Sequence, residues 1–103
     1  MIDINKTIAT TVRTGKVLFG VNDAVRNAKV GKAKLIIVAA NCPQEIRGSI
    51  EHYCRLSHVP IIIYEGTSIE LGAVCGNPFV VSALTIREPG DSEILKLAEA
   101  INA

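Results

Sequence analysis

Hydrophobic positions along the chain follow two periods, one typical of amphipathic helices and the other of buried strands. Apolar residues that recur every three or four positions predict helices over residues 3–13, 21–30, 43–57, 67–75 and 92–101. Short apolar runs rich in β-branched residues predict strands over residues 16–19, 35–40, 61–64 and 81–86. The run at 35–40 is apolar without interruption, which is typical of a central strand covered on both faces.

Local signals support these boundaries. Gly15 and Gly31 follow the last apolar positions of the first two helices, where glycine commonly ends a helix. Pro43 is expected in the first turn of the third helix, and Thr67 and Glu70 have the spacing of a capping box. Five helices alternating with four strands predict one α/β domain, a three-layer α/β/α sandwich around a four-stranded mixed sheet.

Composition narrows the class of protein. Hydrophobic residues make up 49% of the 103 residues and charged residues 20%, as in folded globular proteins. No apolar run approaches the roughly 18 residues of a membrane span, and the N-terminus lacks the pattern of a secretory signal. Cys42, Cys54 and Cys75 form no Cys-x-x-Cys pair or zinc spacing. We therefore expect an intracellular protein without membrane segment, disulfide framework, metal or cofactor.

Charge is distributed unevenly, although the net charge is only +1. Six basic residues and one acid lie between residues 13 and 34, whereas residues 65–103 carry six acids and two basic residues. Such an asymmetry can steer a polyanion toward one face of a protein. A solvated mixture of surface charges produces the same composition, so this observation alone leaves both interpretations open.

Three loops are predicted to meet at one end of the sheet, namely residues 20–23, 41–47 and 76–79. Gly20 permits close approach of a ligand to the backbone, because it has no Cβ. The starts of the second and third helices offer unpaired N–H groups that suit phosphate. In the third loop, Phe79 can stack on an unpaired base. These features predict a binding surface, most consistent with folded RNA.

The polar side chains in these loops fit the same ligand. Asn22 and Asn41 carry donors and acceptors for base edges, and the Asp23 carboxylate can accept hydrogen bonds from a guanine. Arg26 and Lys29 continue one face of the second helix and can contact phosphates.

Each of these residues also has a structural interpretation. Asn22 and Asp23 can cap the first turn of their own helix, and Asn41 can be a turn or cap residue. Phe79 can be a core residue at the entrance of a strand. The two basic residues of the second helix can be an ordinary solvated face.

An enzyme using Cys42 is the alternative from another class. Cys42 follows a buried strand near a predicted helix N-terminus, where a thiolate is favoured. However, His52 points away from that N-terminus, and the spacing from Cys42 to Arg47 is one residue short of the Cys-x5-Arg loop of thiol phosphatases. We therefore expect a non-enzymatic protein.

Ordered sequence blocks extend over the whole chain. They are TGK at 14–16, KAKLIIVAAN at 32–41, YCRLS at 53–57, EGTSIELG at 65–72, VSAL at 81–84 and PGDSxIL at 89–95. With these blocks the chain resembles the eukaryote-type large-subunit ribosomal protein family L-thirty-e, in its archaeal form. This family lies within a superfamily that binds kink-turn RNA, a sharply bent helix–bulge–helix with tandem sheared G·A pairs and one flipped-out base.

The resemblance implies specific contacts. Residues that would face the G·A pairs and nearby phosphates are Gly20, Asn22, Asp23, Arg26, Asn41 and, as a phosphate contact, Arg47. The extruded nucleotide would meet a loop lined by Gly76, Asn77 and Phe79.

The resemblance also implies a function and a cellular place. We expect a monomeric constituent of the cytoplasmic large ribosomal subunit that stabilises a kink-turn in ribosomal RNA beside neighbouring ribosomal proteins. The pair Asn22–Asp23 is closer to the Asn-Glu pair of the sister family L-seven-A-e. That departure leaves an adaptor for small guide RNAs as the alternative.

Overall fold

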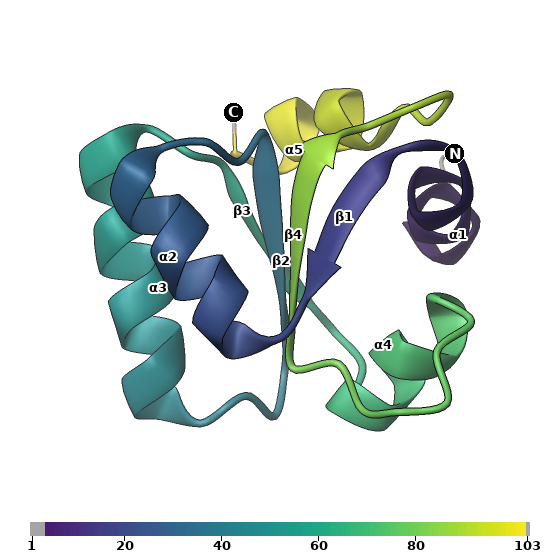
Figure 1. Ribbon diagram of the computed structural model, residues 1–103, viewed down its shortest axis with the longest axis horizontal. Helices are drawn as coiled ribbons and strands as arrows, with labels where there is room; N and C mark the ends of the chain where they lie inside the picture. The colour runs from purple at the N-terminus through teal and green to yellow at the C-terminus, as the bar shows by residue number, and fades with distance from the viewer. Residues whose placement is uncertain (1–3, 103) are drawn as a thin grey trace.

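The computed structural model describes residues 4–102 (Figure 1). Within these residues five helices alternate strictly with four strands, which confirms the expected α/β class and order of elements. In chain order the elements are α1 (Ile4–Thr14), β1 (Lys16–Phe19), α2 (Val21–Val30), β2 (Leu35–Ala39), α3 (Gln44–Ser57), β3 (Ile61–Tyr64), α4 (Ser68–Val74), β4 (Ala83–Glu88) and α5 (Ile94–Asn102). Residue 3, the expected start of the first helix, lies outside the described part.

The four strands form one mixed sheet in the order β1-β4-β2-β3. Strand β4 runs antiparallel to both of its neighbours, and β2 and β3 are parallel. Strands β1, β2 and β3 therefore all end at the same end of the sheet. Because each of them leads into a helix, the starts of α2, α3 and α4 meet there (Figure 1).

Two apolar clusters cover the two faces of the sheet. Helices α2 and α3 lie on one face, where Ile36 and Val38 pack against Ala28 and Ile50. Helices α1, α4 and α5 lie on the other face. All five residues of β2 are buried, as the uninterrupted apolar run predicts for a central strand. The three-layer sandwich is thus confirmed.

Predicted boundaries differ from the structure most clearly at Pro43 and in the last strand. Pro43 is the residue before α3 rather than part of its first turn, since the helix begins at Gln44. The last strand begins at Ala83 and continues to Glu88, two residues later than the pattern at 81–86 indicates. Val81 is buried, but its N–H donates to the carbonyl of Ser68 at 3.0 Å, which holds it against α4 instead of in the sheet.

Backbone hydrogen bonds hold the loops at the helix starts to one another. The N–H of Gly20 donates to the carbonyl of Ala83 at 2.9 Å, and that of Ala40 donates to Gly66 at 3.0 Å. These bonds give the loops fixed positions relative to the sheet. Across residues 4–102, no helix combines the length and apolar character that a membrane span needs.

Candidate nucleic-acid interface

The backbone amides at the N-terminal end of α2, the mouth of this helix, are not capped. Gly20 occupies the N-cap position with φ +110°, a conformation that other residues rarely adopt, and no side chain caps the helix there. The N–H of Ala24 is the first to find a helical partner, the carbonyl of Gly20 at 3.2 Å. Helical geometry leaves the amides before it without intrahelical partners. The mouth of α2 therefore retains the donors and positive dipole end that suit an anion.

Asn22 and Asp23 do not cap this helix. Asn22 is exposed, and its amide has no hydrogen-bond partner among the described residues. Asp23 is half-buried, and its carboxylate lies 3.9 Å from Arg26, an ion pair that is long and well exposed to solvent. Such a surface pair contributes little stability, so both charges are available to a ligand.

Lys29 lies outside the group of loops. It stands in the last turn of α2, seven residues beyond Asn22, or about 10 Å along the helix axis. Its ammonium nitrogen lies 5.0 Å from the centre of the Tyr53 ring, a cation–π contact with α3. Asn22, Lys29 and Tyr53 all line a shallow hollow of about 340 Å³ between the two helices. A ligand that extends along this hollow from Asn22 would also reach Lys29.

Asn41 has a structural role. Its Oδ1 accepts the backbone N–H of Ser68 at 2.8 Å, and its Nδ2 donates to the Ser68 hydroxyl at 3.4 Å. These bonds connect the loop after β2 to the first residue of α4, whereas no side chain caps α3, the helix that follows Asn41. Because Asn41 remains exposed, the same residue lies at the candidate surface.

We expect Asn41→Ala to lower the free energy of unfolding by about 1 kcal/mol, because the N–H of Ser68 loses its acceptor. Asn41→Asp keeps an acceptor oxygen and should lose clearly less. Urea unfolding of both variants and the unmodified protein measures the difference. Equal stability of all three proteins would show that this bond contributes nothing.

Arg47 lies in the first turns of α3, at the same end of the sheet. Its guanidinium is 3.8 Å from the carboxylate of Glu51 one turn later, and both side chains are partly exposed. The pair holds Arg47 along its own helix. A phosphate contact by Arg47 requires it to leave Glu51, which costs little for a solvated ion pair.

The third loop presents Phe79 to solvent. Gly76 has φ +72°, and the side chain of Asn77 accepts the N–H of Phe79 at 3.0 Å, which shapes the turn between them. Phe79 is 75% exposed, so it is not a core residue at a strand entrance. The loop passes so close to α4 that a Cβ on Gly72 would collide with the carbonyl oxygen of Phe79.

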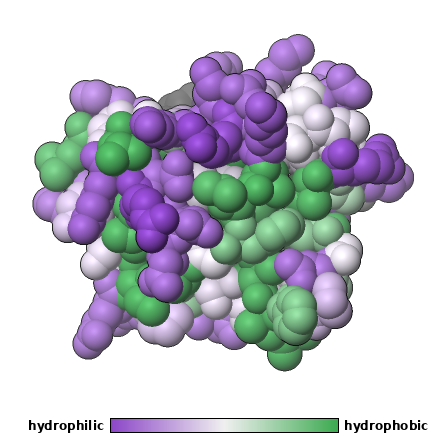
Figure 2. Space-filling view, in the orientation of Figure 1, coloured by the Kyte–Doolittle hydropathy of each residue, from purple (hydrophilic) through white to green (hydrophobic). Residues whose placement is uncertain are grey.

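Two exposed apolar side chains near Phe79 were not predicted from the sequence. Ile69 is 69% exposed and Val80 is 61% exposed, and both lie where residues 79–81 run beside α4. Figure 2 shows apolar side chains gathered over α4 and the loop that follows it. In the sequence, Val80 simply continues the apolar residues of the loop, and Ile69 lies off the buried positions of α4. Neither position therefore stands out as an exposed apolar site. Together with Phe79 they form an apolar patch that suits an unstacked base.

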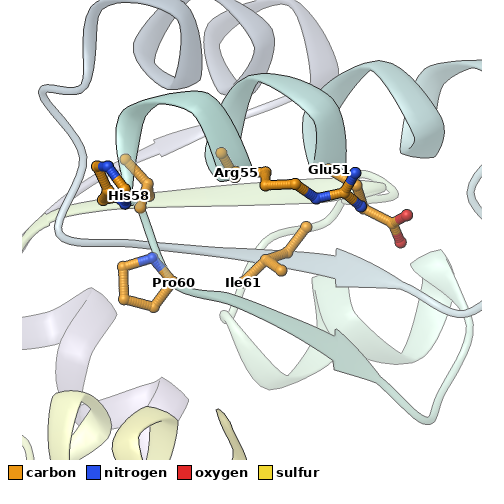
Figure 3. A pocket seen from close by; sticks show the side chains of 7 residues that line it. Glu51, Arg55, His58, Pro60 and Ile61 are labelled. Carbon is orange, nitrogen blue, oxygen red and sulfur yellow. The ribbon is translucent and has the colours of Figure 1, made fainter.

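A second hollow lies at the C-terminal end of α3, with His58 among its lining residues. It measures about 650 Å³, with Glu51 and Arg55 extending from α3 and Pro60 and Ile61 across from them (Figure 3). Burial and the nearby carboxylate of Glu51 raise the pKa of the Cys54 thiol in its wall to about 11. In the part of the chain that the structure describes, no three His, Cys, Asp or Glu side chains gather as a metal site.

Cys42 is not an activated nucleophile. It is only 6% exposed and packs in the cluster beneath α2 and α3. Burial raises the pKa of its thiol, an effect that the positive charge of Arg47 only partly opposes. Burial likewise raises the pKa of Cys75 to about 11. The cysteines therefore behave as small apolar residues, as expected for Cys54 and Cys75.

We expect all three thiols of the folded protein to react with an alkylating reagent at pH 7.5 at least about tenfold more slowly than glutathione. The raised pKa values keep the thiolate fraction small, and burial limits access. Mass spectrometry against time, with a denatured sample as reference, measures the rates. Rapid, selective alkylation of Cys42 in the folded protein would revive the enzyme alternative.

Curated relatives match the chain over nearly its full length. It is 46% identical over 96 residues to the large ribosomal subunit protein eL30 of Methanothermobacter thermautotrophicus, covering 93% of this chain and 98% of the relative. The protein of the same name from Methanosphaera stadtmanae is 47% identical over 98 residues, covering 95% of this chain and all of the relative. The one from Methanococcus maripaludis strain S2 is 48% identical over 96 residues, covering 93% and 96%. These archaeal relatives confirm the resemblance seen in the sequence blocks.

A solved structure and a family model complete the comparison. A Bacillus halodurans protein described as having unknown function superposes with a TM-score of 0.77, over 91% of this chain and 93% of that one. At 16% sequence identity, this likeness concerns the fold alone. The model of the ribosomal protein L7Ae/L30e/S12e/Gadd45 family matches residues 2–96. The chain therefore belongs to the ribosomal protein L7Ae/L30e/S12e/Gadd45 family.

Proposed function

We propose that this protein is a constituent of the large ribosomal subunit that binds and stabilises a kink-turn in ribosomal RNA. The names of its archaeal relatives support the ribosomal part of this proposal. The observation that carries the RNA part is the open mouth of α2, where uncapped amides lie beside the exposed, unpartnered Asn22. We place the protein in the cytoplasm, on the ribosome, beside other ribosomal proteins, and as a monomer when free.

Recognition begins at the mouth of α2. Gly20 lets a bent RNA backbone approach the first-turn amides, which donate to phosphate. The amide of Asn22 donates to and accepts from base edges of the G·A pairs, and the Asp23 carboxylate accepts from a guanine. Arg26 and Arg47 leave their solvated ion pairs and neutralise phosphates brought together by the bend.

The loop after α4 receives the extruded nucleotide. Gly76 and Asn77 set the turn that exposes Phe79, whose ring stacks on the unpaired base. Ile69 and Val80 extend the apolar surface around it. The protein needs no chemical step, because its fixed loops select the kinked conformer from a mobile RNA.

A mobility-shift titration at fixed salt tests the proposal. One RNA carries a kink-turn, and its control has the G·A pairs replaced by Watson–Crick pairs. Tight binding to the first and weak binding to the second is the expected result. Equal, salt-sensitive binding to both would reduce the interaction to a generic basic surface and contradict the proposal. Equally tight binding to several unrelated kink-turn RNAs would favour the guide-RNA adaptor instead.

We expect Phe79→Ala to weaken kink-turn binding by about tenfold, since base stacking on an aromatic ring contributes about 1–3 kcal/mol. The variant should fold normally, because the ring lies in solvent. Repeating the titration with an abasic residue at the flipped-out position isolates the contact. If Phe79 stacks on that base, the substitution has almost no effect on the abasic RNA.

A further inference from the structure

Most of the basic residues between positions 13 and 34 lie away from the candidate interface. Lys16 begins β1, and Lys32 and Lys34 precede β2. Since these two strands end at the loops, their starts lie at the opposite end of the sheet (Figure 1). Arg87 joins them there, near the end of the antiparallel β4. These four residues are called the basic cluster.

Three members of the basic cluster stand on adjacent strands or at their starts. The N–H of Lys34 donates to the carbonyl of Ile86 at 2.8 Å, which places Lys34 beside Arg87. On the other side of β4, Lys16 pairs with Glu88, with a register shift just after it. Neighbouring strands are about 4.8 Å apart, so the backbones of these three residues follow one another across the sheet end at about that spacing.

The charges of the basic cluster are not neutralised within the part of the chain that the structure describes. Lys16, Lys32, Lys34 and Arg87 are all exposed, and none has a carboxylate within 4.0 Å of its side-chain nitrogens. Glu88 is directly opposite Lys16, yet forms no ion pair with it. The four basic residues therefore keep their positive charges beside the exposed acids Glu88, Asp91 and Glu93, although the net charge of the chain is only +1.

We propose that the basic cluster is a second RNA-binding surface, which holds the phosphate backbone of a double-stranded RNA segment. This second surface is separate from the kink-turn interface and shares no residue with it. From Ala83, which contacts Gly20, to Arg87 is four residues of extended strand, or about 14 Å. The protein thus contacts two RNA segments from opposite ends of its sheet and fixes their distance.

The chemistry of this end suits duplex phosphates rather than bases. Binding of single strands relies on aromatic side chains on which bases stack. The aromatic residues of the chain all lie elsewhere: Phe19 and Tyr64 end their strands near the loops, Phe79 follows α4 and Tyr53 is in α3. A row of flexible cations without aromatic neighbours recognises a polyanion by charge, independently of sequence.

A plain RNA duplex without a kink-turn is the direct probe. We expect the double variant Lys34→Gln/Arg87→Gln to bind this duplex about five- to tenfold more weakly at 50 mM salt, because two phosphate contacts are lost. The slope of log affinity against log salt should become shallower by about one to two. The matched control Lys6→Gln/Lys96→Gln removes two exposed charges from α1 and α5 and should change duplex binding less than about twofold.

Kink-turn binding separates this proposal from the first one. The Lys34→Gln/Arg87→Gln variant should retain its affinity for an isolated kink-turn RNA within about twofold, since the loops are unchanged. Immobilised kink-turn RNA saturated with unmodified protein should also capture a labelled duplex, and the variant should capture far less. Equal loss on duplex and kink-turn, or an equal effect of the control pair, would overturn the second surface. The duplex measurement stands even if no kink-turn is bound.

A Lys32 variant tests whether any loss of duplex binding comes from altered folding. Lys32 lies in the turn after α2, outside every strand, with an exposed side chain. Lys32→Gln should therefore leave the thermal unfolding midpoint unchanged and still weaken duplex binding about two- to threefold. Unchanged duplex binding by Lys32→Gln and by the double variant would overturn the proposal.

Discussion

Replacing Asn22 by Ala is expected to weaken kink-turn binding by about 10- to 100-fold, because polar contacts to base edges are worth about 1–3 kcal/mol. The side chain makes no hydrogen bond to the described part of the protein, so its removal costs no internal contact. Alanine is also a better helix former than asparagine. Stability should therefore remain equal or rise slightly while binding falls.

Three comparisons make the Asn22 result specific. Binding to a plain duplex should hardly change, because that contact depends on phosphates. Asn22→Asp keeps an acceptor but loses the amide donor and adds charge, so it should bind no better than Asn22→Ala. His52→Ala, which removes another exposed polar side chain from the outer side of α3, should leave binding unchanged. Parallel losses on kink-turn and duplex would mean that Asn22 does not read bases.

Much of the fold follows from local sequence signals. The uninterrupted apolar run of β2 can be stable only when both faces are covered, which predicts the central strand and the helices on either side. Gly31 adopts φ +67° at the end of α2, where glycine avoids the steric cost of that conformation. Hydrophobic periodicity and glycine positions thus determine the order of elements, because each acts within a few residues.

Features that depend on distant contacts were not predictable in the same way. Val81 looks like a strand residue, but its N–H binds Ser68, thirteen residues earlier. The bond between Asn41 and Ser68 joins segments 27 residues apart, and sequence alone left both a turn or cap role and an RNA role open for Asn41. The basic residues that lie together in the sequence separate to opposite ends of the sheet, since one strand carries the chain from end to end.

Two glycines in helix interiors offer the sharpest test of how packing positions the site. Gly72 in α4 and Gly48 in α3 are both helical, so propensity alone predicts that alanine stabilises each by about 1 kcal/mol. Their surroundings differ. Nothing lies within 4 Å of a Cβ on Gly48, whereas a Cβ on Gly72 would collide with the carbonyl oxygen of Phe79. That oxygen belongs to the backbone, so no side-chain rotation relieves the collision.

We expect the two alanine variants to shift stability in opposite directions. Gly48→Ala should raise the free energy of unfolding by about 0.5–1 kcal/mol through helix propensity. Gly72→Ala should lower it by about 1–3 kcal/mol, because overpacking against the backbone outweighs the propensity gain. For a domain of this size, thermal unfolding midpoints should differ by about 10 °C or more.

Kink-turn affinity should depend on how the loop after α4 packs, and not on the stability of the protein alone. Gly72→Ala forces residues 79 and 80 away from α4 and displaces the Phe79 ring, so kink-turn affinity should fall by about tenfold even well below the unfolding midpoint. Gly48→Ala should bind the kink-turn like the unmodified protein. The combination Gly72→Ala/Phe79→Ala should bind no more weakly than Phe79→Ala alone, since both changes remove the same stacking contact. Additive losses would show that Gly72 acts on RNA binding through another part of the surface.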